Sequence, residues 1–164
     1  LIGRRQRHTS YTVMAKMKFD PKTEHETAGL VVMQACHHMF RIERTISEGK
    51  KVIRFVLVTT EVNTYPHMPN FSAKTTETVM AEREYDSNIV VIKITADLQD
   101  HSFYFGPDQD NLTCLYENAD GRAINPENIG GMVGTIIGMF ASSNDTESNN
   151  YVCFDWFLYT GSDN

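Results

Sequence analysis

Hydrophobic and polar residues alternate with a period of two along much of the chain, as expected of β-strands that bury one face. Residues 28–36 form a more continuous apolar run, which is typical of a central strand covered on both faces. Residues 39–46 alternate again, which predicts that Arg41 and Glu43 lie on a solvent-facing side. The clearest alternation is in residues 11–19, whose apolar members are Tyr11, Val13, Ala15, Met17 and Phe19.

Further strands are predicted between these and the C-terminus, about ten in all. Turn-forming residues recur roughly every 8–15 residues, a spacing that favours an all-β sandwich or barrel. The remaining predicted strands cover residues 52–62, 79–85, 89–96, 102–105, 112–117, 132–139 and 151–159.

The connections are mostly turns and loops. Residues 47–50 predict a hairpin with Gly49 in the turn. Residues 63–74 and 142–150 predict long polar loops, and residues 125–128 predict one short helical turn capped by Asn125.

Composition fits one ordinary globular domain. The 164 residues contain 41% hydrophobic residues and carry 15 Lys+Arg against 21 Asp+Glu, a net charge of −6. An acidic chain without a long basic cluster argues against nucleic acid as a partner. No apolar run approaches the roughly 20 residues of a membrane span. The chain does not begin with Met, so we expect a piece of a longer protein; its compartment (secreted, periplasmic or cytoplasmic) stays open.

The three cysteines are widely and irregularly spaced, without a C-x-x-C pair. Each stands in an apolar stretch. We therefore expect Cys36, Cys114 and Cys153 to be small buried side chains rather than reactive thiols.

Four short motifs occur in an order that resembles a known family. Residues 3–6 read GRRQ, residues 26–31 read ETAGLV, residues 134–139 read GTIIGM and residues 154–157 read FDWF. Together they resemble the C-terminal domain of glycoside hydrolase family 43, the β-xylosidase and arabinofuranosidase group.

The resemblance implies a concanavalin A-like β-sandwich (jelly roll) of two antiparallel sheets. It also implies that catalysis belongs to an N-terminal five-bladed propeller of the same polypeptide, which this chain lacks. The sandwich would be non-catalytic, stabilise the propeller and shape its active-site rim, so its contact with oligosaccharide is indirect. Two alternatives stay open: an autonomous carbohydrate-binding module, and a structural interface domain that mediates homo-oligomerisation.

The chain departs from the family pattern at two positions. Cys153 stands where the family often has Asp, and Met132 replaces the aromatic residue that usually precedes the Gly-Thr strand. In family members that aromatic can reach toward the active site. We therefore expect Gly131 and Met132 to lie at the propeller-facing rim, with Met132 partly exposed.

Independent catalysis is not expected. Glycoside hydrolysis needs two carboxylates across a sugar-binding cleft, and catalytic concanavalin-like sandwiches commonly show E-x-D-x-x-E. The nearest sequence runs from Glu84 through Asp86 to Ile89 and lacks the final acid.

Sugar binding would require exposed aromatic side chains. Tyr65, Phe71 and Tyr104 are candidates for the binding-module alternative, although we favour an interdomain contact for Tyr65, His67 and Phe71. Trp156 is expected in the core, together with Phe154 on one face of its strand. Binding of free xylo- and arabino-oligosaccharides should then be weak or absent.

No cofactor is expected, although concanavalin-like folds often hold structural Ca²⁺. Asp108 and Asp110, or Asp145, could form fragments of a calcium loop, but polar turn chemistry is the simpler interpretation. His37 and His38 are adjacent and should point to opposite faces of a strand, so we interpret them as structural.

Overall fold

The computed structural model describes residues 1–61, 74–125 and 134–162. These residues form eleven strands and one turn of 3₁₀ helix. The elements are β1 (Ile2–Arg5), β2 (Ser10–Lys18), β3 (Thr27–Ala35), β4 (His38–Ser47), β5 (Lys50–Glu61), β6 (Lys74–Glu84), β7 (Ile89–Asp97), β8 (Asp100–Gly106), β9 (Thr113–Asp120), η1 (Gly121–Ile124), β10 (Ile136–Ser142) and β11 (Cys153–Ser162).

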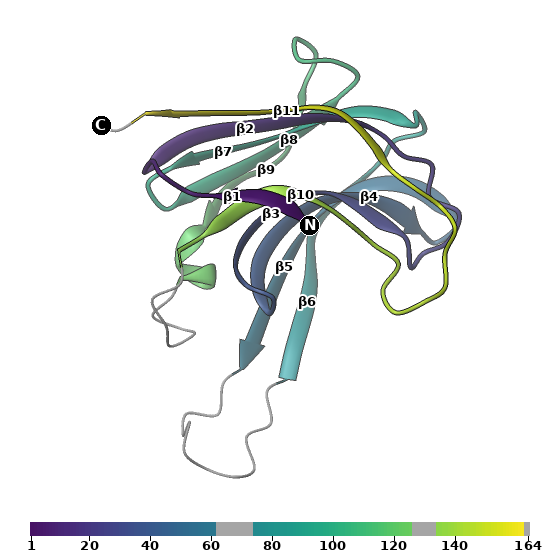
Figure 1. Ribbon diagram of the computed structural model, residues 1–164, viewed down its shortest axis with the longest axis horizontal. Helices are drawn as coiled ribbons and strands as arrows, with labels where there is room; N and C mark the ends of the chain where they lie inside the picture. The colour runs from purple at the N-terminus through teal and green to yellow at the C-terminus, as the bar shows by residue number, and fades with distance from the viewer. Residues whose placement is uncertain (62–73, 126–133, 163–164) are drawn as a thin grey trace.

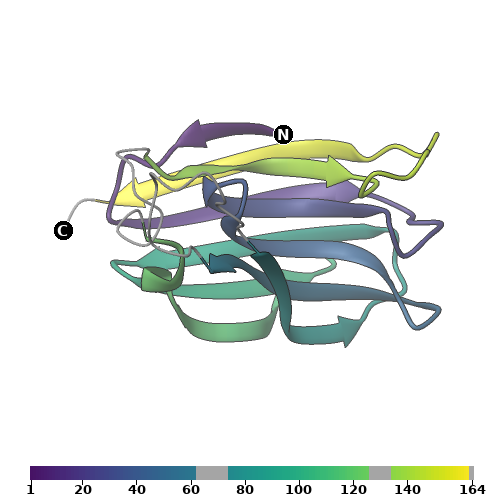
Figure 2. The same cartoon turned by 90° about the horizontal axis from the view of Figure 1, so that it is seen from below.

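The strands form two antiparallel sheets packed face to face, which confirms the predicted sandwich (Figure 1). The larger sheet has the order β1-β10-β3-β4-β5-β6, and the smaller has the order β11-β2-β7-β8-β9. Seen from below, the strands of the two layers run in roughly the same direction, the aligned packing of sandwiches (Figure 2). The core between the sheets is apolar and includes Val13, Leu30, Ile42, Phe55 and Phe103.

The strand predictions are confirmed in place, with shifted boundaries. β1 was not predicted, because its sequence is short and half cationic. The helical turn predicted at residues 125–128 lies outside the described residues apart from Asn125, and the described 3₁₀ turn, η1, directly precedes it. Asp120 caps η1 by accepting a hydrogen bond from the Arg122 backbone N–H, 2.9 Å long, and Asn125 is the C-cap with extended backbone.

The outer face of β4 is not solvent-facing, contrary to the alternation. Glu43 is fully buried, and the Arg54 Nε donates to its Oε1 at 2.8 Å. Arg41 lies beside it, with its Nε 3.2 Å from Glu43 Oε2. The long side chains of Arg41 and Arg54 lie across Glu43 here, so they exclude water from its carboxylate.

A β-bulge in β11 overturns the predicted place of Trp156. Phe154 pairs with Met17, but Trp156 pairs with Lys16, so Asp155 is an extra residue. Residues directly opposite each other share a face of the sheet. Phe154 and Phe157 therefore pack against the core, and Trp156 lies on the outer face.

The cysteines are more exposed than predicted. Cys36 and Cys153 are exposed, and Cys114 is half-buried. Cys36 lies in the tight turn between β3 and β4, Cys153 begins the edge strand β11, and Cys114 pairs with Tyr104 on the outer face of its sheet. None of these places is in the core, despite apolar neighbours in sequence.

Gly29 explains why one motif contains glycine. A Cβ at this position would lie 2.0 Å from the Ile42 carbonyl oxygen of β4. Backbone atoms cannot move away without opening the sheet, so only glycine fits this close approach.

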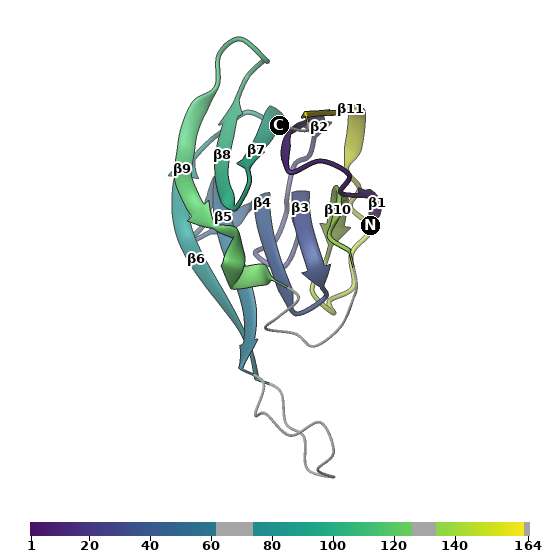
Figure 3. The ribbon, with the colours of Figure 1, turned by 90° about the vertical axis from the view of Figure 1, so that its left-hand side faces the viewer.

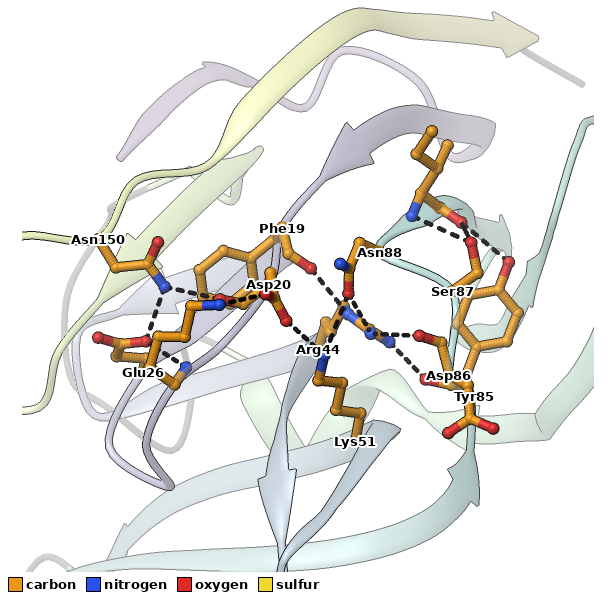
Figure 4. A network of polar contacts seen from close by, with 12 residues as sticks. Phe19, Asp20, Glu26, Arg44, Lys51, Tyr85, Asp86, Ser87, Asn88 and Asn150 are labelled. Carbon is orange, nitrogen blue, oxygen red and sulfur yellow. Dashed lines mark hydrogen bonds and ion pairs between the residues drawn. The ribbon is translucent and has the colours of Figure 1, made fainter.

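Arg44 joins the two sheets at one end of the sandwich (Figure 4). Its side chain is fully buried on the core-facing side of β4. The guanidinium donates to the carbonyl oxygens of Phe19 at 2.9 Å and Tyr85 at 2.7 Å, and more distantly to the Asp86 carbonyl and the Asn88 side chain. Phe19 follows β2, and Tyr85 to Asn88 connect β6 to β7, so one side chain fixes the ends of both sheets.

Glu26 organises the loops beside Arg44. Its buried carboxylate accepts hydrogen bonds from the Lys22 backbone N–H at 2.7 Å, Ser148 Oγ at 2.6 Å and Asn150 Nδ2 at 2.8 Å. Burial opposes its ionisation, but these donors outweigh burial and lower the pKa of Glu26. Hydrogen bonds from Lys22 and Lys51 lower the pKa of Asp20 to about 2.

Replacing Arg44 with Met should destabilise the chain by about 2–4 kcal/mol, because buried carbonyl oxygens lose their donors. Arg83→Met is the matched control, since Arg83 is exposed on β6 and should change stability by less than about 0.5 kcal/mol. Urea unfolding of both variants measures the difference. Equal midpoints would contradict the structural role of Arg44.

Acid should weaken the fold through Glu26 and Asp20. Folding lowers both pKa values, so their stabilisation is complete above the unfolded-state values of about 4 and is lost as the pH falls through the folded-state values, which for Asp20 is about 2. Thermal unfolding between about pH 6 and about pH 2 should show this loss. Glu26→Gln should make the melting temperature less dependent on pH. Glu48→Gln, in the exposed β4–β5 turn, should leave the pH dependence of the melting temperature unchanged.

Candidate functional site

The predicted rim residues Gly131 and Met132, and the contact candidates Tyr65, His67 and Phe71, lie outside the described residues. The residues that flank both segments are described. Glu61 and Lys74 end β5 and begin β6, while Asn125 and Gly134 follow η1 and precede β10. η1 and these ends of β5 and β6 lie toward the same end of the sandwich, opposite Arg44 (Figure 3). We call this the loop end.

A polar pocket of about 160 Å³ lies at the loop end, at the base of the segment between Asn125 and Gly134. Residues from five separate parts of the chain meet there. Its polar lining comprises Gln6, Gln34, Gln99, His101, Asn125 and Thr135.

Thr135 links the start of β10 to two neighbouring segments. Its Oγ1 donates to the side-chain oxygen of Gln34 at 2.7 Å, and its carbonyl accepts from the Gln6 backbone N–H at 2.8 Å. Gln34 is buried on β3. One wall of the pocket is therefore held by hydrogen bonds between β1, β3 and β10.

His101 forms the opposite wall and is buried. Its Nδ1 lies 3.2 Å from the Gln99 carbonyl and its Nε2 lies 3.1 Å from Tyr11 Oη. A carbonyl can only accept, so Nδ1 carries the proton and Nε2 accepts from the tyrosine. Burial lowers the pKa of His101, which keeps the ring neutral near pH 7. Both imidazole nitrogens are thus used within the protein, so the groups of the described lining suited to hydrogen-bonding hydroxyls are side-chain amides and the Thr135 hydroxyl.

The structure brings two carboxylates to one arginine, a cluster that the sequence analysis missed. The Arg41 Nη2 lies 2.9 Å from Glu77 Oε2, and Arg41 also contacts the buried Glu43. Burial raises the pKa of Glu43, opposed by Arg41 and Arg54. Glu43 faces these guanidinium groups and is closed to solvent, so it cannot reach a glycosidic oxygen. The sequence signal for this cluster was the run of closely spaced charges in Arg41-Ile42-Glu43-Arg44.

The acids of the nearest E-x-D sequence are separated from this cluster. Glu84 ends β6 and pairs with Lys50, and Asp86 is exposed in the connection to β7. The segment is the end of β6 together with the connection that leads to β7.

The metal candidates form turns. Asp108 Oδ1 accepts from the backbone N–H groups of Asp110 and Asn111 at 2.9 and 3.0 Å, which together with the Asn111 side chain lowers the pKa of Asp108. Asp145 is exposed in a turn with positive φ. Within the described ranges, no three His, Cys, Asp or Glu side chains converge as a metal site, and no helix is long and apolar enough to cross a membrane.

Tyr104, the remaining sugar-binding candidate, is half-buried on the outer face of β8. The Lys93 ammonium lies 5.3 Å from its ring centroid. It follows His101 on the same strand but does not line the loop-end pocket.

Known proteins resemble this chain over almost all its length. It is 32% identical over 158 residues to the non-reducing end alpha-L-arabinofuranosidase BoGH43B of Bacteroides ovatus, which covers 95% of this chain and 27% of that protein. The solved structure of Bacteroides ovatus xyloglucan PUL GH43B superimposes with a TM-score of 0.76 at 29% identity, over 98% of this chain and 29% of that one.

A more distant structure shares the fold. The GH43 protein BlXynB of Bacillus licheniformis aligns with a TM-score of 0.80 at 18% identity, over 98% of this chain and 29% of that chain. The chain therefore spans little more than a quarter of these relatives. The model of the beta xylosidase C-terminal concanavalin A-like domain matches residues 1–160, so this chain belongs to that family of domains from glycoside hydrolase family 43 proteins.

Proposed function

We propose that this domain is a non-catalytic part of a β-xylosidase- or arabinofuranosidase-like glycoside hydrolase that degrades plant polysaccharide. Its role is to stabilise a linked N-terminal catalytic propeller and to shape the rim of that propeller's active site. The observation that carries the proposal is the polar pocket at the base of the 125–134 segment.

The pocket supports the rim role through its chemistry. Thr135 and Gln34 are held in one orientation by their mutual hydrogen bond. Groups fixed in this way can position the segment that begins after Asn125, or a sugar hydroxyl that reaches it, without reorganisation.

An apolar groove supports the stabilising role. It has a volume of about 480 Å³ and lies between the edge strands β1 and β11, where Met139, Phe157 and Tyr159 are only partly buried. Ile2 is 74% exposed and Leu158 is 45% exposed beside it. Exposed apolar side chains around a groove are suited to contact with a linked domain.

The isolated chain should not hydrolyse aryl β-xylosides or α-arabinofuranosides. Turnover by the pure chain that disappears in the Glu84→Gln variant would contradict this expectation.

In the parent enzyme, Thr135→Val should lower kcat/KM severalfold while the melting temperature stays within a few degrees. Steady-state kinetics and thermal unfolding measure the two effects. Thr113→Val is the control, since Thr113 is exposed at the start of β9 and does not line the pocket. Equal kinetics in both variants would argue against a rim role.

Ile2→Asp should separate docking from folding. In the isolated chain this exposed side chain should matter little, by about 0.5 kcal/mol or less. In the two-domain protein, burial of this carboxylate should cost about 2 kcal/mol, although Arg4, which lines the same groove and lies over the Tyr159 ring, would offset part of that cost. Chemical unfolding of both proteins tests this. An equal change in the free energy of unfolding of the two proteins would show that the groove is not part of the interface.

A further inference from the structure

The outer face of the smaller sheet carries an ordered array of side chains that the proposed rim role does not use. Three rows cross the strands β11, β2, β7 and β8 in register. The first row is Trp156, Lys16, Val91 and Gly106; the second is Leu158, Met14, Lys93 and Tyr104; the third is Thr160, Thr12, Thr95 and Ser102.

The bulge at Asp155 creates this array. If the register continued without a bulge, Asp155 would stand opposite Lys16 and Trp156 would share the core face of Phe154. With the bulge, Trp156 stands opposite Lys16 on the outer face. Trp156 and Tyr104 are both half-buried and lie three strand spacings apart, roughly 14 Å. Figure 1 shows this sheet as the upper layer, with no other described strand on its outer side.

The charges within the three rows are both positive, although the chain is acidic overall. Lys16 and Lys93 are these residues, and the Lys93 ammonium lies 5.3 Å from the Tyr104 ring centroid. The acidic groups nearby lie outside the rows. Asp155 Oδ2 at the sheet edge lies 3.5 Å from Lys16 Nζ, Glu117 of β9 contacts Cys114 beside Tyr104, and Asp97 and Asp100 lie beyond the threonine row. Cations among aromatic rings and hydroxyls complement an anionic ligand that also has apolar faces and hydroxyl groups.

We propose that this face binds an oligosaccharide that carries carboxylates, such as a xylan-type chain with uronic acid branches. The rings of Trp156 and Tyr104 contact the C–H faces of two sugars, the threonine row hydrogen-bonds hydroxyls, and Lys93 pairs with the carboxylate. The sheet face lies apart from the loop-end pocket, so this activity is independent of the rim role.

A carbohydrate fits the array better than an acidic protein surface. The threonines of the third row and the lysines break up the apolar area, which therefore lacks the continuous hydrophobic centre of protein interfaces. Two aromatic rings spaced along a polar face instead match a repeating, hydroxyl-rich ligand.

The test is isothermal titration of the 164-residue chain with xylotetraose that carries one glucuronic acid branch, alongside unbranched xylotetraose and poly-glutamate. We expect binding of the branched sugar that weakens at high salt, and at least about tenfold weaker binding of the neutral sugar. Trp156→Ala should weaken branched-sugar binding about tenfold. Lys93→Gln should weaken it about threefold and remove most of the salt dependence.

Tyr151→Ala is the matched control, since Tyr151 is an aromatic residue, 76% exposed, outside the three rows. Chemical-shift mapping on the unaltered chain keeps the test independent of how the variants fold, and should show changes on β2, β7, β8 and β11. Four results would each overturn the proposal. They are no binding of the branched sugar, equal affinity for the neutral sugar, equal binding of poly-glutamate, and chemical-shift changes confined to the loop end. If the parent enzyme lost the rim function but the chain still bound the branched sugar, the proposed rim role would fail and the sheet-face proposal would be supported.

Discussion

The sandwich depends on a buried arginine whose guanidinium has to find hydrogen-bond acceptors. Arg44 lies on the core-facing side of β4, where a cation without partners would be costly. Its donors are satisfied by carbonyl oxygens after β2 and between β6 and β7, so chain segments from both sheets must converge on it. The position of β4 therefore determines where the other strands end.

This requirement makes the two ends of the molecule different. At the Arg44 end, Glu26, Asn150 and Lys51 extend the network and tie the loops to the sheets. At the loop end, Gln34, Thr135 and His101 leave a polar pocket between them. Under the proposed rim role, rigidity at one end would allow the other to serve recognition, the usual division between scaffold and binding loops.

A second division separates the two outer faces. The outer face of the larger sheet is closed by the ion pairs of Glu43 with Arg41 and Arg54. That of the smaller sheet displays Trp156 and Tyr104 with lysines and threonines. The difference arises from one inserted residue in β11 and from charge placement on β4, neither of which changes the fold.

The sequence by itself determined the fold class, most strand positions and the family, because period-two alternation and turn residues are local properties and four motifs in order are specific. The hairpin at 47–50 was predicted from Gly49, whose φ is +75°, and Glu48 beside it also adopts a positive φ of 49°. Tertiary structure decided what depends on partners distant in the chain. Alternation predicted that Glu43 is exposed to water, but the arginines of β4 and β5 bury it. Alternation also predicted Trp156 in the core, but a bulge in the pairing of β11 with β2 turns Trp156 outward. The pocket was likewise invisible, since Gln6, Gln34, His101 and Thr135 meet only when four separate segments fold together.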